Sequence, residues 1–236
     1  MNLLTLIVLL PLAGFVLNGL AGPRLGRGFV SVVGCGLPIL AFLATVRAFL
    51  QLNGAEGEAL VETAYTWALV GDFSLDIAFY FDRLSALMTL IVTGVGSLIH
   101  IYSTGYMKDD PSYARYFAYL NLFLFFMLLL VLGRSLLVCF VGWEGVGLAS
   151  YLLIGFWFED PAKAAAGKKA FITNRVGDAG FLLGMFLVYH ALGTLNFDEV
   201  NAAFNAEVMP AVSASLVGLL LFIGATGKSA QIPLHV

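Results

Sequence analysis

Charged residues are scarce in this chain of 236 residues. Asp, Glu, Lys and Arg together make up 11% of it, whereas an ordinary soluble domain contains about 25%. The deficit excludes a typical water-soluble domain, because 60% of the residues are hydrophobic and they gather in repeated apolar runs of about 20 residues, the length that crosses a bilayer. The sequence therefore predicts an integral membrane protein that is surrounded by lipid.

Cysteine, histidine and basic clusters are also scarce. The two Cys and three His lie far apart, so we expect neither a disulfide framework nor a metal site. With a net charge of -3 and no cluster of Lys and Arg, a nucleic-acid partner is not expected. The chain also lacks a Gly-rich phosphate loop after a strand, so we expect no nucleotide, flavin or other cofactor on it.

The apolar runs predict an all-α polytopic membrane protein with about seven transmembrane helices. Between the second and third runs, the stretches 61–67 and 73–79 alternate in polarity on either side of the turn signal Gly71-Asp72. This pattern favours a small extramembrane β-hairpin, with an amphipathic loop as the alternative. The spans are expected at about residues 1–20, 29–50, 84–102, 116–132, 134–158, 170–192 and from 211 onward.

These features divide the chain into two N-terminal transmembrane helices (1–50), an outer-side acidic loop or hairpin (51–82) and the first part of a membrane module (83–236). We expect an N-terminal fragment of a longer protein, because the last residues still belong to an apolar run. Positive-inside reasoning places the N-terminus of this multi-pass protein outside the cell inner (plasma) membrane. The basic residues on the cytoplasmic side would be Arg24, Arg27, Lys108, Arg115, Lys163, Lys168 and Lys169.

Of the charged residues inside the predicted spans, four are candidates for a functional site: Glu144 in the fifth span, Arg175 and Asp178 in the sixth, and Lys228 in the seventh. A charge in hydrocarbon is costly, so each should face a protein interior or a wet cavity and have a partner. Arg175 and Asp178 are three residues apart and can pair on one helix face. An acid and an amine at similar depth on separate helices indicate proton or cation handling. The alternative is a set of permanent salt bridges that hold the helices together.

Two further residues are candidates for a proton relay. His100 lies near the inner end of the third span and has an ordinary pKa near neutrality, although a lone membrane histidine can also be an interhelical hydrogen bonder. Lys168 precedes Arg175 by seven residues and falls on the same helical stripe. The glycines around Glu144 and Asp178 favour close helix packing. Pro233, five residues after Lys228, predicts a helix break beside the lysine.

Three motifs carry a resemblance to a known family. WEGVGLASYLLIGFWF surrounds Glu144, AFITNRVGDAGFLLG surrounds Asp178, and GKSAQIPLHV contains Lys228. In this order they resemble the antiporter-like subunit L of bacterial NADH-quinone oxidoreductase (respiratory complex I), whose mitochondrial counterpart is NADH dehydrogenase subunit 5. The resemblance covers the entire chain, including FYFDRLSALM and IVTGVGSLIHIYSTGYM.

The resemblance implies a larger protein built from inverted five-helix repeats, each with a broken helix. Glu144 matches the channel glutamate of the family, Lys228 matches its broken-helix lysine, and Asp178 and Arg175 match the residues between them. The chain would then be the first part of a proton-translocating module, with the second half-channel and the long lateral helix beyond Val236.

The implied function is proton translocation coupled to electron transfer from NADH to quinone. Other membrane-arm subunits of complex I would be the partners, and subunits outside this chain would bind NADH, quinone, FMN and the iron-sulfur clusters. One alternative is the large subunit of a multi-subunit sodium/proton antiporter, which shares the Glu and Lys positions. Another is a structural membrane-arm subunit without its own channel.

Overall fold

The computed structural model describes residues 2–54, 59–70, 73–206 and 208–235. Its chain divides into two compact units, which are described separately. Unit 1 comprises residues 1–133 and 141–149, and unit 2 comprises residues 134–140 and 150–236. The predicted turn residues Gly71 and Asp72 lie outside the described residues.

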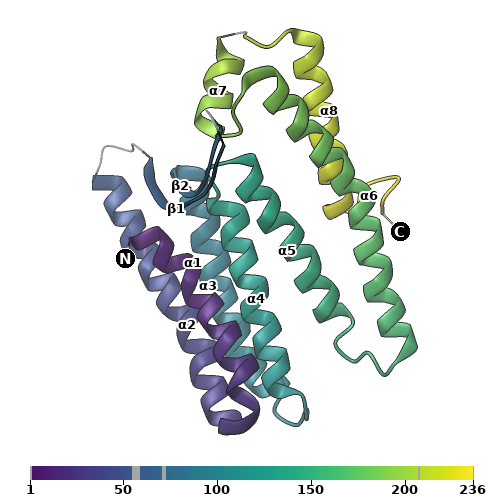
Figure 1. Ribbon diagram of the computed structural model, residues 1–236. Helices are drawn as coiled ribbons and strands as arrows, with labels where there is room; N and C mark the ends of the chain where they lie inside the picture. Colours follow the sequence, from purple (N-terminus) through teal and green to yellow (C-terminus); the bar gives the residue numbers. More distant parts are fainter. Residues whose placement is uncertain (1, 55–58, 71–72, 207, 236) are drawn as a thin grey trace. The chain divides into compact units, whose positions relative to one another are not determined.

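Four long helices form the body of unit 1 (Figure 1). Helix α1 contacts α2 and α4, and α2 also contacts α3 and α4. Their buried residues are mostly apolar, but α3 also buries a polar series that includes Thr89, Thr93 and Ser97. Each of these three hydroxyls donates to the carbonyl four residues earlier, which satisfies it within the helix. The helices are α1 (Leu3–Leu20), α2 (Gly22–Gly54), α3 (Arg83–Tyr106) and α4 (Tyr113–Leu132).

The β-hairpin predicted for the acidic segment is confirmed. Strands β1 (Leu60–Val70) and β2 (Phe73–Phe81) pair antiparallel. Glu62 on β1 joins the hairpin to the start of α1, because its Oε2 accepts hydrogen bonds from the backbone N–H groups of Leu4 (2.9 Å) and Thr5 (3.2 Å). The hairpin therefore covers the end of the bundle at which α1 begins.

The opposite end of unit 1 is basic. Gly26 breaks the start of α2 with a φ of 83°, a left-handed conformation that glycine adopts at no steric cost. Arg27 follows this break, and its guanidinium donates to the backbone carbonyls of Lys108 and Asp110 in the turn between α3 and α4. The contact joins two loops that sequence reasoning had assigned to the same side of the membrane.

Ser135 caps the start of helix α5 (Leu136–Ile154), because its side chain accepts a hydrogen bond from the Val138 N–H at 3.2 Å. A serine at this position satisfies a backbone donor that the helix itself leaves unpaired. The middle of α5, residues 141–149, belongs to unit 1, and its two ends belong to unit 2.

Helix α6 (Pro161–Leu192) begins earlier than predicted. The expected sixth span started at about residue 170, with Lys163, Lys168 and Lys169 in a loop; that boundary was wrong, because these lysines lie on the first turns of α6. Asp160 caps the helix through the Ala162 N–H, and Pro161 fits the first helical position, where an N–H is not needed.

Glycines bring α6 against α8 (Ala211–Lys228) in unit 2. A Cβ at Gly180 would stand 2.8 Å from Ile223 Cγ2, and one at Gly177 would stand 3.2 Å from the Gly227 Cα. Such spacing lets the two backbones approach closely, as small residues do in membrane helix pairs. In the sequence, α7 (Phe197–Asn205) lies between α6 and α8, and it is the short helix predicted to start near Asp198 and Glu199.

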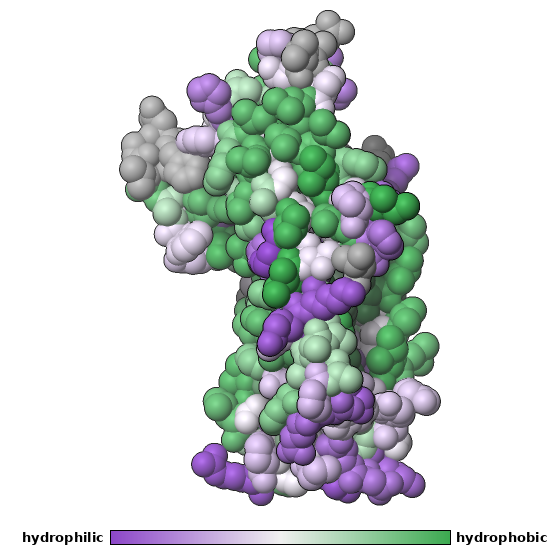
Figure 2. All heavy atoms as spheres, turned by 90° about the vertical axis from the view of Figure 1, so that its right-hand side faces the viewer, coloured by the Kyte–Doolittle hydropathy of each residue, from purple (hydrophilic) through white to green (hydrophobic). Residues whose placement is uncertain are grey.

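Six helices in the described part of the chain are long and apolar enough to cross a membrane. They are α1 to α6, and the shorter apolar segment Ser213–Lys228 of α8 accounts for the seventh predicted run. Hydrophobic side chains cover broad areas of the face shown in Figure 2. The protein is therefore a multi-pass, predominantly helical membrane protein, with a small hairpin among the residues that the structure describes.

Candidate functional site

A partly buried ion pair occupies the middle of α6. Arg175 Nη2 lies 3.1 Å from Asp178 Oδ2, as the three-residue spacing predicted. Asp178 is only 2% exposed, and the Arg175 guanidinium also lies over the Phe171 ring, 4.7 Å from its centroid. The carboxylate is thus held inside the protein by a positive charge on its own helix face, which is the pairing that a buried charge needs.

Lys228 extends this pair into a cluster of three charges. It is half-buried in the last turn of α8, and the charges of both Asp178 and Arg175 act on it. The close contact of Gly177 with Gly227 explains why, because each glycine immediately precedes one of the charged residues. Helix α8 ends at Lys228, five residues before Pro233, so the lysine lies beside a helix end.

Glu144 lies on the part of α5 that belongs to unit 1, where it is half-buried. Its neighbours Gly142 and Gly145 lie directly against α4, where added methyl groups would collide with Leu130 and Phe126. The expectation that these glycines serve helix packing is confirmed. That Glu144 acts together with Lys228 stays a prediction, because the two residues belong to different units.

His100 on α3 is 2% exposed. Its Nδ1 lies 2.7 Å from the carbonyl oxygen of Gly96, and since a carbonyl only accepts, Nδ1 carries the proton. The other ring nitrogen, Nε2, has no hydrogen-bond partner among the described residues. The ring adjoins a 230 Å³ apolar cleft between α3 and α4. Lys168 is exposed on α6, and a relay through either residue stays a prediction.

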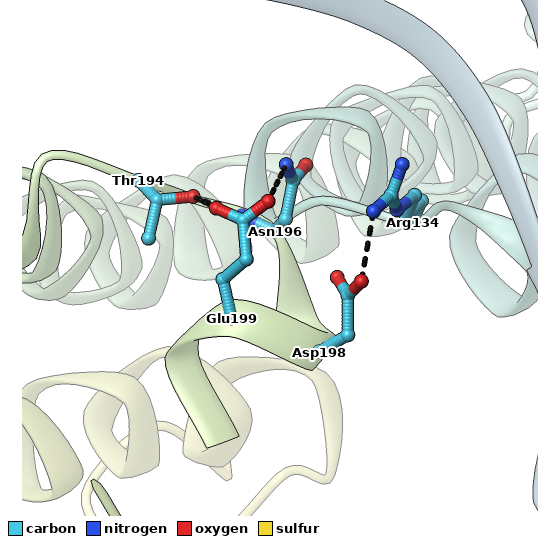
Figure 3. A network of polar contacts seen from close by, with 5 residues as sticks. All are labelled: Arg134, Thr194, Asn196, Asp198 and Glu199. Carbon is cyan, nitrogen blue, oxygen red and sulfur yellow. Dashed lines mark hydrogen bonds and ion pairs between the residues drawn. The ribbon is translucent and has the colours of Figure 1, made fainter. Parts of the chain in front are cut away.

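Sequence reasoning missed a second ion pair at the start of α5. Arg134 Nη2 donates to Asp198 Oδ2 at 2.8 Å, while Glu199 accepts from Thr194 and from Asn196 (Figure 3). Burial raises the pKa of Asp198, but the hydrogen bond and charge of Arg134, together with hydrogen bonds from the backbone N–H groups of Asp198 and Glu199, lower it below its ordinary value. The sequence showed that Asp198 and Glu199 start a helix, but it did not show that Asp198 pairs with Arg134, 64 residues earlier.

Two family models match the chain. One, described as NADH-Ubiquinone oxidoreductase (complex I), chain 5 N-terminus, matches residues 67–117. The other, described as NADH:quinone oxidoreductase/Mrp antiporter, TM, matches residues 133–236. The second match includes Glu144 and all three charges of the α6–α8 cluster.

Two solved structures share the fold, each with a TM-score of 0.81 over 99% of this chain. One is the membrane-bound sulfane sulfur reductase, an archaeal respiratory membrane complex, with 23% identity and 35% of that chain covered. The other is the Mrp complex from Dietzia sp. DQ12-45-1b, with 24% identity and 24% of that chain covered.

Curated relatives named NADH-quinone oxidoreductase subunit L align along almost all of the chain. The protein of Mycobacterium tuberculosis (strain ATCC 25618 / H37Rv) is 46% identical over 98% of this chain and 36% of its own length. That of Escherichia coli (strain K12) is 45% identical over 100% of this chain and 38% of its own. The chain thus spans little more than a third of these relatives. The chain is therefore similar along almost all of its length to NADH-quinone oxidoreductase subunit L, and two family models of complex I and antiporter proteins match it.

Proposed function

We propose that this chain forms part of a proton-translocating membrane subunit of NADH-quinone oxidoreductase. The observation that carries the proposal is the cluster of Arg175, Asp178 and Lys228, in which charges on two packed membrane helices act on one another. The relatives' printed name supports the oxidoreductase complex as its setting. Buried ionisable groups of this kind mark proton and ion pathways in membrane proteins.

The cluster can hold or release a proton at Lys228. A neighbouring carboxylate favours the charged form of an ammonium group, whereas a neighbouring guanidinium and removal from water disfavour it. Lys228 is subject to all three influences, since both Asp178 and Arg175 act on it while it is half-buried. A change in the charge or position of Asp178 therefore changes how tightly Lys228 holds its proton. In this scheme Glu144 delivers or receives protons, with His100 and Lys168 as relays.

The redox chemistry belongs to partner subunits under this proposal. They bind NADH and quinone and carry FMN and iron-sulfur clusters, while this chain contacts other membrane-arm subunits and lipid. The protein lies in the cell inner membrane with its N-terminus outside. The separation of charge in unit 1 supports this orientation, since Arg24, Arg27, Lys108 and Arg115 lie towards one end and the hairpin covers the other.

Replacing Glu144 by Gln in the full-length subunit tests the proposal. The change removes the ionisable group and keeps its shape, so NADH-driven proton uptake by inverted membrane vesicles should fall strongly while NADH oxidation by the assembled complex persists. Glu159→Gln, at an exposed position just after α5, is the matched control and should pump normally. Normal proton uptake by an assembled Glu144→Gln complex would favour a purely structural role.

A cation antiporter is the second candidate, because the model matching residues 133–236 is described for both NADH:quinone oxidoreductase and Mrp antiporters. The two functions differ in what drives transport. Co-purification of the full-length protein with flavin and iron-sulfur subunits, and proton transport that requires NADH, would support the oxidoreductase. Sodium/proton exchange without NADH, in a complex of small membrane subunits, would support the antiporter.

A further inference from the structure

Two asparagines are buried inside the helix bundle of unit 1. Asn18 on α1 and Asn121 on α4 are both 0% exposed. An amide that is removed from water without hydrogen-bond partners is destabilising, and hydrocarbon around the bundle makes the requirement stricter. The two side chains belong to neither the charge cluster nor the groups around Glu144.

Glycines of α1 and α2 bring the two amides to one place. The Oδ1 of Asn121 lies directly against Gly14, which is one helical turn before Asn18 on the same face of α1. On α2, the carbonyl of Gly34 accepts a hydrogen bond from Asn121 Nδ2 at 3.3 Å. A Cβ at Gly34 would stand 3.1 Å from Asn18 Nδ2. Asn18 and Asn121 therefore meet around Gly34, where α1, α2 and α4 converge.

The hydrogen bonds of this group are unevenly satisfied. Asn121 Nδ2 donates to the carbonyls of Gly34 and Phe117, the latter at 2.9 Å. Asn121 Oδ1 and both amide atoms of Asn18 have no hydrogen-bond partner among the described residues. Buried polar groups of native proteins normally have a partner, protein or water.

We propose that Asn18, Asn121 and Gly34 form an internal hydration site that holds ordered water between α1, α2 and α4. Water both donates and accepts, so one molecule can serve the oxygen of Asn121 and either atom of Asn18. A metal cation matches the oxygens alone and would bring an uncompensated charge, because the fully buried side chains described for α1 to α4 include no carboxylate. The site is a hydrated contact between three helices of the bundle, and it is separate from the charge cluster of α6 and α8.

A high-resolution map of the full-length subunit in its complex tests the site directly. The expected result is a density peak within about 3.2 Å of Asn121 Oδ1 and an Asn18 amide atom, which disappears in Asn18→Leu. The proposal is overturned if a map that resolves other buried waters shows no peak. It is equally overturned if the two amides bond each other directly, or if the peak depends on sodium.

Thermal unfolding of the same complex provides an independent test. Asn18→Leu should lower the midpoint, because it leaves Asn121 Oδ1 without its bridge, and Asn18→Leu/Asn121→Leu should lower it by less than the sum of the single changes. Thr45→Val is the matched control, since its buried hydroxyl already donates to Ala41. Additive effects no larger than that of the control would contradict the site.

Discussion

At the scale of a single side chain, Asp198 shows that an ion pair can lower a pKa even though burial raises it. Burial raises the pKa of this carboxyl, but Arg134 and the backbone N–H groups of Asp198 and Glu199 together lower it by more. A carboxyl whose pKa is lowered in the folded state stabilises the fold above its ordinary pKa, and that stabilisation is lost as the pH falls through the lower folded-state pKa. Neither side chain is deeply buried, so the pair is a modest contributor.

Asp198→Asn should therefore destabilise the full-length subunit at neutral pH by about 1 kcal/mol or less. The difference from the wild type should shrink only below the ordinary pKa of 3.8, where the wild-type carboxyl also becomes neutral. Thermal midpoints recorded from about pH 7 down to about pH 3 measure it, with the exposed Asp109→Asn as control. A difference that stays constant through the acid range would show that the ion pair is not its source.

Individual residues were predictable where their partners are local. The pairing of Arg175 with Asp178 follows from their three-residue spacing on one helix. Arg134 finds Asp198 64 residues away, and Asn18 meets Asn121 on a helix far along the chain, so a single sequence could not show these contacts. A lone Asn within an apolar run is nevertheless a signal that a buried partner or water is needed.

At the scale of elements, hydrophobic runs predicted the helices well and their boundaries less well. The start of α6 was misplaced because three lysines were interpreted as a loop. Long lysine side chains at a helix end can reach past the apolar layer, so they lie on the helix without preventing it. The stronger signal was Asp160-Pro161, a capping residue followed by a proline at the first helical position.

The contact between α6 and α8 gives a test at this scale. Gly180→Ala adds a methyl group where Ile223 Cγ2 and the Leu220 carbonyl stand 2.8 and 2.9 Å from the Cβ position. Because backbone must move, the change should cost about 1–3 kcal/mol, measured as a lower thermal midpoint of the complex. Gly218→Ala on α8, with nothing within 4 Å, is the control. Equal midpoints for the two variants would show that this helix contact tolerates the methyl group.

For the molecule as a whole, the fold class, the hairpin and the similarity to NADH-quinone oxidoreductase subunit L followed from the sequence, because composition, alternation and motif order are readable along the chain. The division into two units could not be predicted from the sequence, since it depends on which helices pack together in space. That α5 contributes residues to both units, and that Glu144 lies on the part within unit 1, also required the structure.

Orientation in the membrane is the prediction that concerns the entire molecule. Single cysteines at Thr63 on the exposed hairpin and at Asp109 in the α3–α4 turn, with Cys35 and Cys139 replaced, mark the two ends of unit 1. An impermeant thiol reagent should label Thr63→Cys in intact cells and Asp109→Cys only in inverted vesicles, because the basic end is retained in the cytoplasm. The opposite labelling pattern would reverse the assignment.

The bond from Glu62 to the beginning of α1 has a consequence for biosynthesis. Asn2 provides no side-chain cap there, and the acceptor for Leu4 comes from a residue 58 positions later. The ribosome therefore finishes the first two membrane helices before the carboxylate that completes the first one exists. Until the hairpin has been translated and has folded back, water must serve the backbone N–H groups in the first turn of α1. The contact between the hairpin and α1 therefore forms only after both strands have been synthesised.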